Sequence, residues 1–147
     1  MLFRSIGEMA GKVLPEAFTC FTLSLDNLSE LTKRFGYTVG DGVLKDFAGL
    51  VQLMGDTEGM RGYNGVGRFV VFFEECSSKK AAAMIRILDN QVEEYNSLNP
   101  EYPIRYTAAW ATTEETDTYE IRELLRLSQK KWKQMEKEKK DKTEEET

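Results

Sequence analysis

Hydrophobic and polar positions along this chain switch between two spacings. Three apolar runs are rich in β-branched and aromatic residues, and they predict strands over residues 18–25, 68–73 and 104–111. Residues 60–63 predict a further short strand. It forms a hairpin with 68–73 around an Asn-Gly turn, because both residues of such a pair tolerate positive φ.

Between these runs, apolar residues recur every three or four positions, which predicts helices. Leu28 and Leu31 belong to the first such stripe, which Gly36 ends. A second helix is predicted after Gly40-Asp41. The other predicted helices begin near residues 5, 77 and 118, and the last of them carries its apolar face from Ile121 to Met135.

The predicted order is helix, strand, helix, helix, hairpin, helix, strand, helix. Strands that alternate with helices around one hairpin predict an α/β fold with a mixed central sheet covered by helices. A chain of 147 residues is long enough for one domain with a sizeable core. We expect residues 1–17 to form an N-terminal helix or linker and 18–135 the domain. Residues 136–147, mostly Lys and Glu, are expected to be a charged solvated tail.

The composition of the chain argues against several classes of function and site. The net charge of −5 leaves no basic excess for binding nucleic acid. The chain has no histidine, which removes the usual general base, and any metal would rely on carboxylates and so favour Mg²⁺. Its two cysteines lie in or beside apolar runs, which favours a reducing, cytoplasmic setting over a disulfide scaffold. No apolar span of 18 residues is present, so no membrane insertion is expected.

Four segments resemble those of a GGDEF domain, the catalytic module of diguanylate cyclases. Residues 23–28 resemble the segment Asp-x-Asp-x-Phe, and 35–44 are similar to Tyr-Gly-His-x-x-Gly-Asp-x-x-Leu. Residues 65–69 fall on the signature hairpin, and 124–132 on the closing helix of the family. The resemblance covers about residues 18–135. It implies a palm-like fold of nucleotide cyclases with a ferredoxin-like core.

In that family, two GTP-loaded domains face each other, and two metal ions hold the triphosphate for phosphoryl transfer. The resemblance places Ser24 at the first metal-binding Asp and keeps the second as Asp26. The acidic residue before the signature Phe, here Phe69, becomes Arg68, which reverses the charge beside the metal. Three metal positions are therefore vestigial: Ser24, Asp26 and Arg68.

The signature turn carries the sequence Gly65, Val66, Gly67, Arg68, Phe69. Val66 replaces the second glycine, and its Cβ disfavours the open turn. In an alternative register, Asn64 and Gly65 stand for the two glycines, and the turn still has no carboxylate. The residues that read the base fall on Thr32 and Asp41, so the candidates for nucleotide binding are Asp41, Thr32, Asn64 and Gly65.

Each of these residues also has a purely structural interpretation. Asp41 also suits a cap of the helix after Gly40. Asp26 also suits a cap of the helix that begins near Leu28, or a group that supports a metal ligand without binding the metal itself. Arg68 either binds a phosphate or an acidic partner, or is a solvated charge at a strand edge that prevents edge pairing.

The sequence therefore predicts a non-catalytic GGDEF-like signalling domain. It would act as a regulatory or dimerisation module in bacterial cyclic-di-GMP-type signalling, with no catalytic residue, metal or cofactor. The expected partners are other domains or proteins of a signalling system, or a second copy of the chain. Two alternatives stay open. One is a regulatory domain that retains GTP and Mg²⁺ without turnover, and the other is a diguanylate cyclase with an altered active site.

Overall fold

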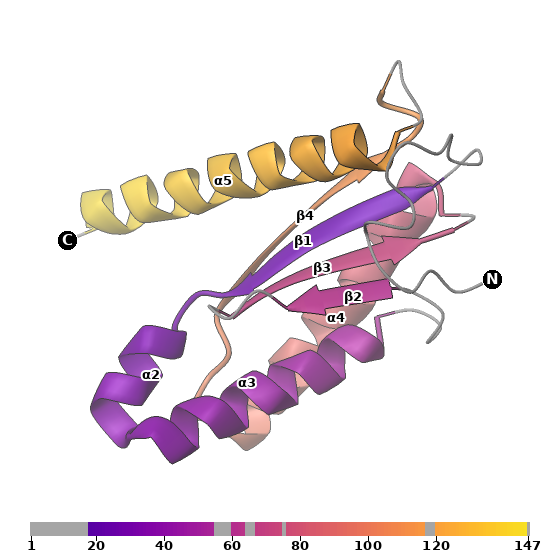
Figure 1. Cartoon of the computed structure of the whole chain (residues 1–147). Helices are drawn as coiled ribbons and strands as arrows, with labels where there is room; N and C mark the ends of the chain where they lie inside the picture. Colours follow the sequence, from indigo (N-terminus) through magenta and orange to yellow (C-terminus); the bar gives the residue numbers. More distant parts are fainter. Residues whose placement is uncertain (1–17, 55–59, 64–66, 75, 117–119, 147) are drawn as a thin grey trace.

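The structure, a computed structural model, describes residues 18–54, 60–63, 67–74, 76–116 and 120–146 (Figure 1). The predicted N-terminal helix lies outside these residues. The elements follow the predicted order, and their bounds are β1 Thr19–Leu25, α2 Leu28–Phe35, α3 Tyr37–Gln52, β2 Met60–Tyr63, β3 Arg68–Phe73, α4 Ser78–Leu98, β4 Tyr106–Thr112 and α5 Ile121–Glu146.

The four strands form one sheet in the order β2-β3-β1-β4. This is the split βαβ arrangement of a ferredoxin-like core, so the predicted α/β class is confirmed. The predicted mixed sheet is wrong for the described strands, since every neighbouring pair is antiparallel. The crossover through α2 and α3 does make β2 parallel to β1. However, β3 lies between them and removes the parallel contact.

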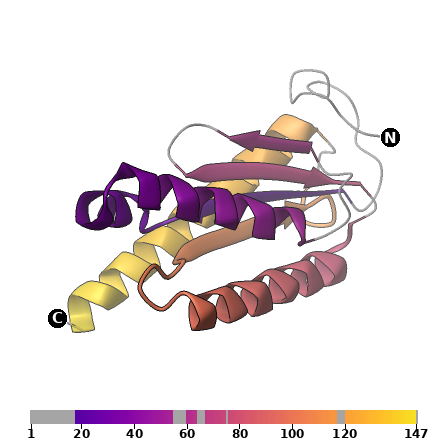
Figure 2. The same cartoon turned by 90° about the horizontal axis from the view of Figure 1, so that it is seen from below.

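Helices cover both faces of the sheet. Figure 1 shows α5 alone on one face and α2, α3 and α4 on the other, and Figure 2 shows α3 and α4 running beside each other across that second face. All seven residues of β1 are buried. Phe21, Leu23 and Leu25 pack with the core between the sheet and α2–α4. The alternate positions face α5, and two of them are polar. Thr22 forms a hydrogen bond with Ser128 of α5, and Ser24 accepts one from Trp132 of α5.

The joint between α2 and α3 differs from the prediction. Helix α3 begins at Tyr37 instead of after Gly40, and only Gly36 separates the two helices. Gly36 has φ of 95°, a left-handed conformation that favours glycine, so it reverses the chain by itself. Gly40 is buried inside α3, where a Cβ would lie 2.3 Å from Thr32 Oγ1. This glycine therefore serves close packing of α2 on α3, and it does not mark the start of a helix.

Residues 137–142, in the segment expected to be a charged solvated tail, are exposed, and they are helical. Helix α5 continues past residue 135 to Glu146, so residues 136–146 extend the domain's last helix. Lys and Glu are strong helix formers, and Glu136 pairs with Lys140 one turn later at 3.4 Å. Lys139 contacts the sheet and is not simply solvated. No helix in the described part of the chain is both long and apolar enough to span a membrane.

Candidate functional site

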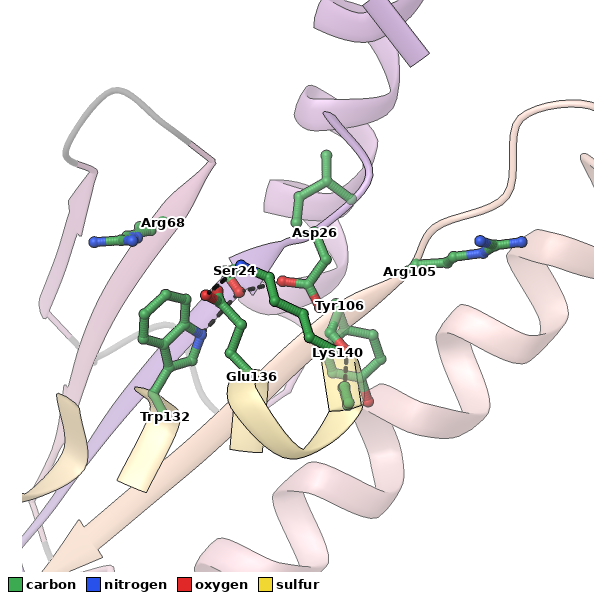
Figure 3. A pocket seen from close by; sticks show the side chains of 10 residues that line it. Ser24, Asp26, Arg68, Arg105, Tyr106, Trp132, Glu136 and Lys140 are labelled. Carbon is green, nitrogen blue, oxygen red and sulfur yellow. Dashed lines mark hydrogen bonds and ion pairs between the residues drawn. The ribbon is translucent and has the colours of Figure 1, made fainter. Parts of the chain in front are cut away.

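A pocket opens where β1 ends and β3 and β4 begin, beneath the second half of α5 (Figure 3). Its volume is about 790 Å³. The lining residues lie on these four elements or directly beside their ends: Ser24, Leu25, Asp26, Arg68, Arg105, Tyr106, Trp132, Glu136, Lys139 and Lys140. The pocket therefore gathers Ser24, Asp26 and Arg68, the three vestigial metal positions of the sequence analysis.

Trp132 of α5 occupies the place beside Ser24. The indole Nε1 donates a hydrogen bond of 2.8 Å to Ser24 Oγ, and both residues are buried. Ser24 Oγ in turn donates to Asp26 Oδ1 at 2.6 Å. Both the hydroxyl proton of Ser24 and a lone pair on its oxygen are thus engaged within the protein.

Arg68 lies on the other side of the same tryptophan. Ser24 and Arg68 are opposite each other in the register of β1 and β3. The guanidinium carbon of Arg68 is 4.4 Å from the centre of the Trp132 ring, which is a cation–π contact. The two substituted metal positions therefore hold one side chain between them, the serine through a hydrogen bond and the arginine through its charge.

Asp26 is held by hydroxyl groups. Its carboxylate accepts from Ser24 Oγ and, at 2.5 Å, from Thr107 Oγ1 of β4. The predicted capping role for Asp26 is wrong, because the residue before α2 is Asn27, and no side chain caps that helix. Asp26 is instead a link between β1 and β4, held by two donated hydrogen bonds.

Positive charge dominates the pocket, although the whole chain is acidic. Arg68, Arg105, Lys139 and Lys140 face only two carboxylates, Asp26 and Glu136. Lys139 Nζ donates to the backbone oxygen of Tyr106 at 2.6 Å and to Thr107 Oγ1 at 3.1 Å. Such a lining favours an anion over a cation.

The described residues contain no group of three or more Asp, Glu, Cys or His side chains placed to hold a metal ion. One further carboxylate lies near the pocket wall, where Asp89 of α4 accepts a hydrogen bond from the hydroxyl of Tyr106. Burial raises the pKa of Asp89, and the positive charge of Lys139 opposes this effect. Asp89 is thus tied to a tyrosine and is not free to coordinate a metal.

The candidate base-reading residues do not line this pocket. Thr32 Oγ1 donates to the carbonyl oxygen of Leu28 in the same helix at 2.9 Å. Asp41 lies inside α3 and forms an ion pair of 3.1 Å with Lys45, so its predicted role as a helix cap is wrong. Asn64, Gly65 and Val66 lie outside the described residues.

The end of the signature turn is described. Gly67 has φ of 73°, and its carbonyl oxygen accepts a hydrogen bond of 2.8 Å from the backbone of Leu25. A Cβ at this position would approach the Leu25 oxygen to 3.3 Å, so glycine is favoured by both conformation and space. Phe69 packs edge-on against Phe47 of α3 at 5.8 Å between ring centres. Gly67 is thereby fixed against the end of β1, where the pocket lies.

Sequence reasoning missed the α5 side of the pocket. Trp132 was placed on the apolar face of its helix, and Lys139 and Lys140 in a solvated tail. The helical spacing of Ser128, Trp132 and Glu136 does put them on one face, which is the signal that was present. The spacing does not show that this face of α5 crosses the end of β1 at Ser24.

Residues 7–142 match a family model described as diguanylate cyclase, GGDEF domain. The chain belongs to the GGDEF family. The match covers most of the chain and includes the four segments on which the resemblance was based.

Solved structures of other GGDEF domains have the same fold. The active GGEEF domain of a diguanylate cyclase from Vibrio cholerae superposes with a TM-score of 0.74 at 19% identity, covering 84% of this chain and 78% of that one. An EAL/GGDEF domain protein from M. capsulatus gives 0.69 at 13% identity, with 90% and 85% covered. A microbial GGDEF domain studied with cyclic di-GMP gives 0.58 at 25% identity, with 74% and 65% covered. No similar sequence was found among curated proteins.

Proposed function

We propose that this GGDEF domain is non-catalytic and acts as a regulatory or dimerisation module in bacterial cyclic-di-GMP-type signalling. The observation that carries the proposal is the arrangement of Ser24, Trp132 and Arg68. At the two positions where the family supplies metal carboxylates, this chain has a hydroxyl and a cation, and both are committed to an indole ring.

Electrostatics and the nature of the available ligands both oppose the binding of two Mg²⁺ ions here. A serine hydroxyl is a weak ligand for a hard dication, and the Arg68 charge repels one. Asp26, the remaining carboxylate, already accepts two hydrogen bonds. Loss of metal-held transition-state charge costs several kcal/mol, on the order of 10³-fold in rate, for each essential carboxylate.

A role in signalling is supported by membership of the GGDEF family and by the domains and ligands that are associated with other members. The relative from M. capsulatus combines a GGDEF with an EAL domain, and another GGDEF structure was solved in a study of its interaction with cyclic di-GMP. We infer partners of the same kind for this chain, either other domains of a signalling protein or a second copy. The cytoplasmic setting expected from the sequence is part of this proposal.

The direct test is turnover. The purified chain is incubated with GTP and Mg²⁺ or Mn²⁺, and the products are separated by chromatography, with the Vibrio cholerae GGEEF domain as the positive control. We expect no cyclic dinucleotide above the level of a reaction without protein. Steady product formation would contradict the proposal and would favour a diguanylate cyclase with an altered active site.

A second candidate function is GTP binding without turnover, which the cationic lining of the pocket favours. Thermal melting of the chain with GTP, in Mg²⁺ and separately in EDTA, distinguishes a GTP-binding domain from a regulatory domain that binds no nucleotide. A rise in Tm of several degrees supports the binding domain. An equal rise in EDTA attributes the affinity to arginine and lysine, whereas a rise only in Mg²⁺ would mean that a metal site survives.

A further inference from the structure

Among the described strands, β4 lies at one edge of the sheet, and the hydrogen bonds on its inner side show which of its backbone groups face outward. Asp26 donates its backbone N–H to the carbonyl oxygen of Arg105 at 2.8 Å, and Thr113 donates to that of Phe18 at 3.0 Å. Odd-numbered residues of β4 therefore direct their backbone groups toward β1. In an antiparallel ladder the even-numbered residues, Tyr106 to Thr112, direct theirs outward.

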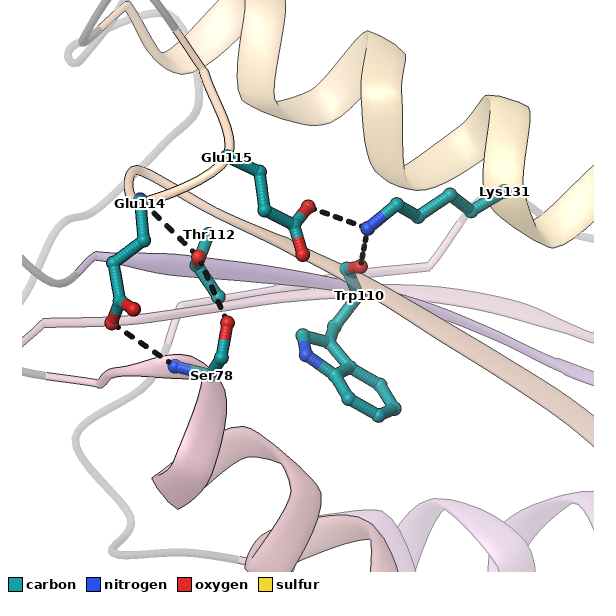
Figure 4. Close-up of polar contacts among 6 residues, drawn as sticks. All are labelled: Ser78, Trp110, Thr112, Glu114, Glu115 and Lys131. Atoms are coloured by element: carbon teal, nitrogen blue, oxygen red, sulfur yellow. Dashed lines mark hydrogen bonds and ion pairs between the residues drawn. The ribbon is translucent and has the colours of Figure 1, made fainter.

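Two lysines of α5 reach this outer edge. Lys131 Nζ donates to the carbonyl oxygen of Trp110 at 3.1 Å, and Lys139 Nζ donates to that of Tyr106 at 2.6 Å. Lys131 is further held by an ion pair with Glu115 (Figure 4). The two lysines are eight residues apart on the helix, and the two carbonyl oxygens they cap are four residues apart on the strand.

The strand itself has none of the usual defences of an edge. Its seven residues, Tyr106–Thr112, include no charged residue and no proline. Short uncharged segments rich in aromatic and β-branched residues are those that pair with other chains when an edge is open. Protection of this edge by charge must therefore come from another element, and α5 supplies side chains that reach its carbonyl oxygens.

We propose that Lys131 and Lys139 guard the outer edge of β4 against antiparallel pairing with the same edge of a second copy of this chain. Each lysine occupies a carbonyl oxygen that an incoming strand would need, and places a positive charge there. Two copies of β4 related by a twofold axis would also bring these lysines close together, so like charges oppose the approach. The inference rests on the edge alone and is independent of catalysis.

The test is a double variant, Lys131→Met with Lys139→Met, which keeps the aliphatic stems and removes the donors and charges. The matched control is Lys133→Met with Lys137→Met, because these lysines are exposed on the same helix and the change in net charge is equal. Light scattering after gel filtration at several concentrations gives the mass. We expect the double variant to show at least twice the mass of the wild type, and the control to match the wild type.

Amide hydrogen exchange identifies the surface that pairs. In the associated variant, the outward N–H groups of Ala108 and Trp110 should exchange at least tenfold more slowly than in the wild type. An unchanged mass in a folded variant would overturn the proposal, as would a larger mass without protection at these two amides. If circular dichroism shows the double variant to be unfolded, the two single variants replace it with the same readouts and the same criteria.

Discussion

At the scale of single residues, Trp132 is the side chain that defines the site. It is buried, its Nε1 donates to Ser24, and its ring carries the guanidinium of Arg68. A tryptophan this deeply buried contributes mainly through the apolar area of its ring, and its N–H needs an acceptor. Ser24 supplies that acceptor.

Trp132→Phe removes the hydrogen bond but keeps an aromatic ring. We expect this change to lower the free energy of unfolding by about 1–2 kcal/mol, because a neutral buried hydrogen bond is lost and some packing with it. Urea unfolding measures the loss. In a double-mutant cycle with Ser24→Ala, the two changes should be non-additive by about 1 kcal/mol, and strictly additive losses would show that the bond contributes nothing.

The buried thiols make stability depend on alkaline pH. Burial raises the pKa of Cys20 from 9.0 to about 12, with an opposing effect of the hydrogen bond to Ser128, and burial also raises the pKa of Cys76. Above about pH 9, an unfolded thiol releases its proton while the folded one keeps it. The stability that these thiols contribute is therefore present below that pH and lost as the pH rises toward 12.

The Cys20→Ala variant isolates this effect from other groups that titrate in the same range. Between pH 8.5 and pH 10, the wild type should lose about 1 kcal/mol more of its free energy of unfolding than the variant does. Urea unfolding at the two pH values measures both losses. Equal losses in the two proteins would mean that Cys20 already ionises in the folded state.

At the scale of elements, the segment that leads into β4 is held by two asparagines rather than by a regular element. Asn27, just before α2, donates to the carbonyl oxygen of Pro103 at 2.7 Å and accepts from the Arg105 N–H at 3.1 Å. Asn96 of α4 bonds in the same two-point way to the backbone of Ile104. Together they fix the start of β4, where Arg105 and Tyr106 line the pocket.

Asn27→Ala should cost about 2–3 kcal/mol of unfolding free energy, because it leaves a backbone donor and a backbone acceptor without partners in a largely buried place. Asn90→Ala, on the exposed face of α4, is the control and should change stability by less than about 0.5 kcal/mol. Chemical unfolding compares them. Similar small effects for both asparagines would contradict the bracing role of Asn27.

The bounds of β2 and β3 followed from local patterns, whereas β4, predicted over 104–111, spans Tyr106–Thr112, and the joint between α2 and α3 was misplaced. Residues 60–63 and 68–73 were predicted as strands, and β2 and β3 have these bounds, since short apolar runs around an Asn-Gly turn are encoded locally. The start of α3 was misplaced because Gly40 is a packing glycine, and its role depends on Thr32 of another helix. Tertiary contact, not local propensity, decided that position.

At the scale of the whole molecule, the fold brings together Ser24, Asp26 and Arg68, the positions that the family resemblance assigned to metal binding. Ser24 and Arg68 are opposite each other in the β-ladder, and Asp26 follows at the end of β1. Trp132 enters from the far end of the sequence through α5. A residue 108 positions away has no local signal that ties it to Ser24, so the tryptophan could be found only in the folded protein.

The central claim is that this site no longer binds a nucleotide through metal ions, and calorimetric titration of GTP tests it most directly. The wild type and a variant that combines Ser24→Asp, Val66→Gly and Arg68→Glu are compared, each with Mg²⁺ and with EDTA. We expect Mg²⁺ to leave the affinity of the wild type for GTP unchanged and to raise that of the variant at least tenfold. A wild-type affinity that rises tenfold or more on addition of Mg²⁺ would contradict the account.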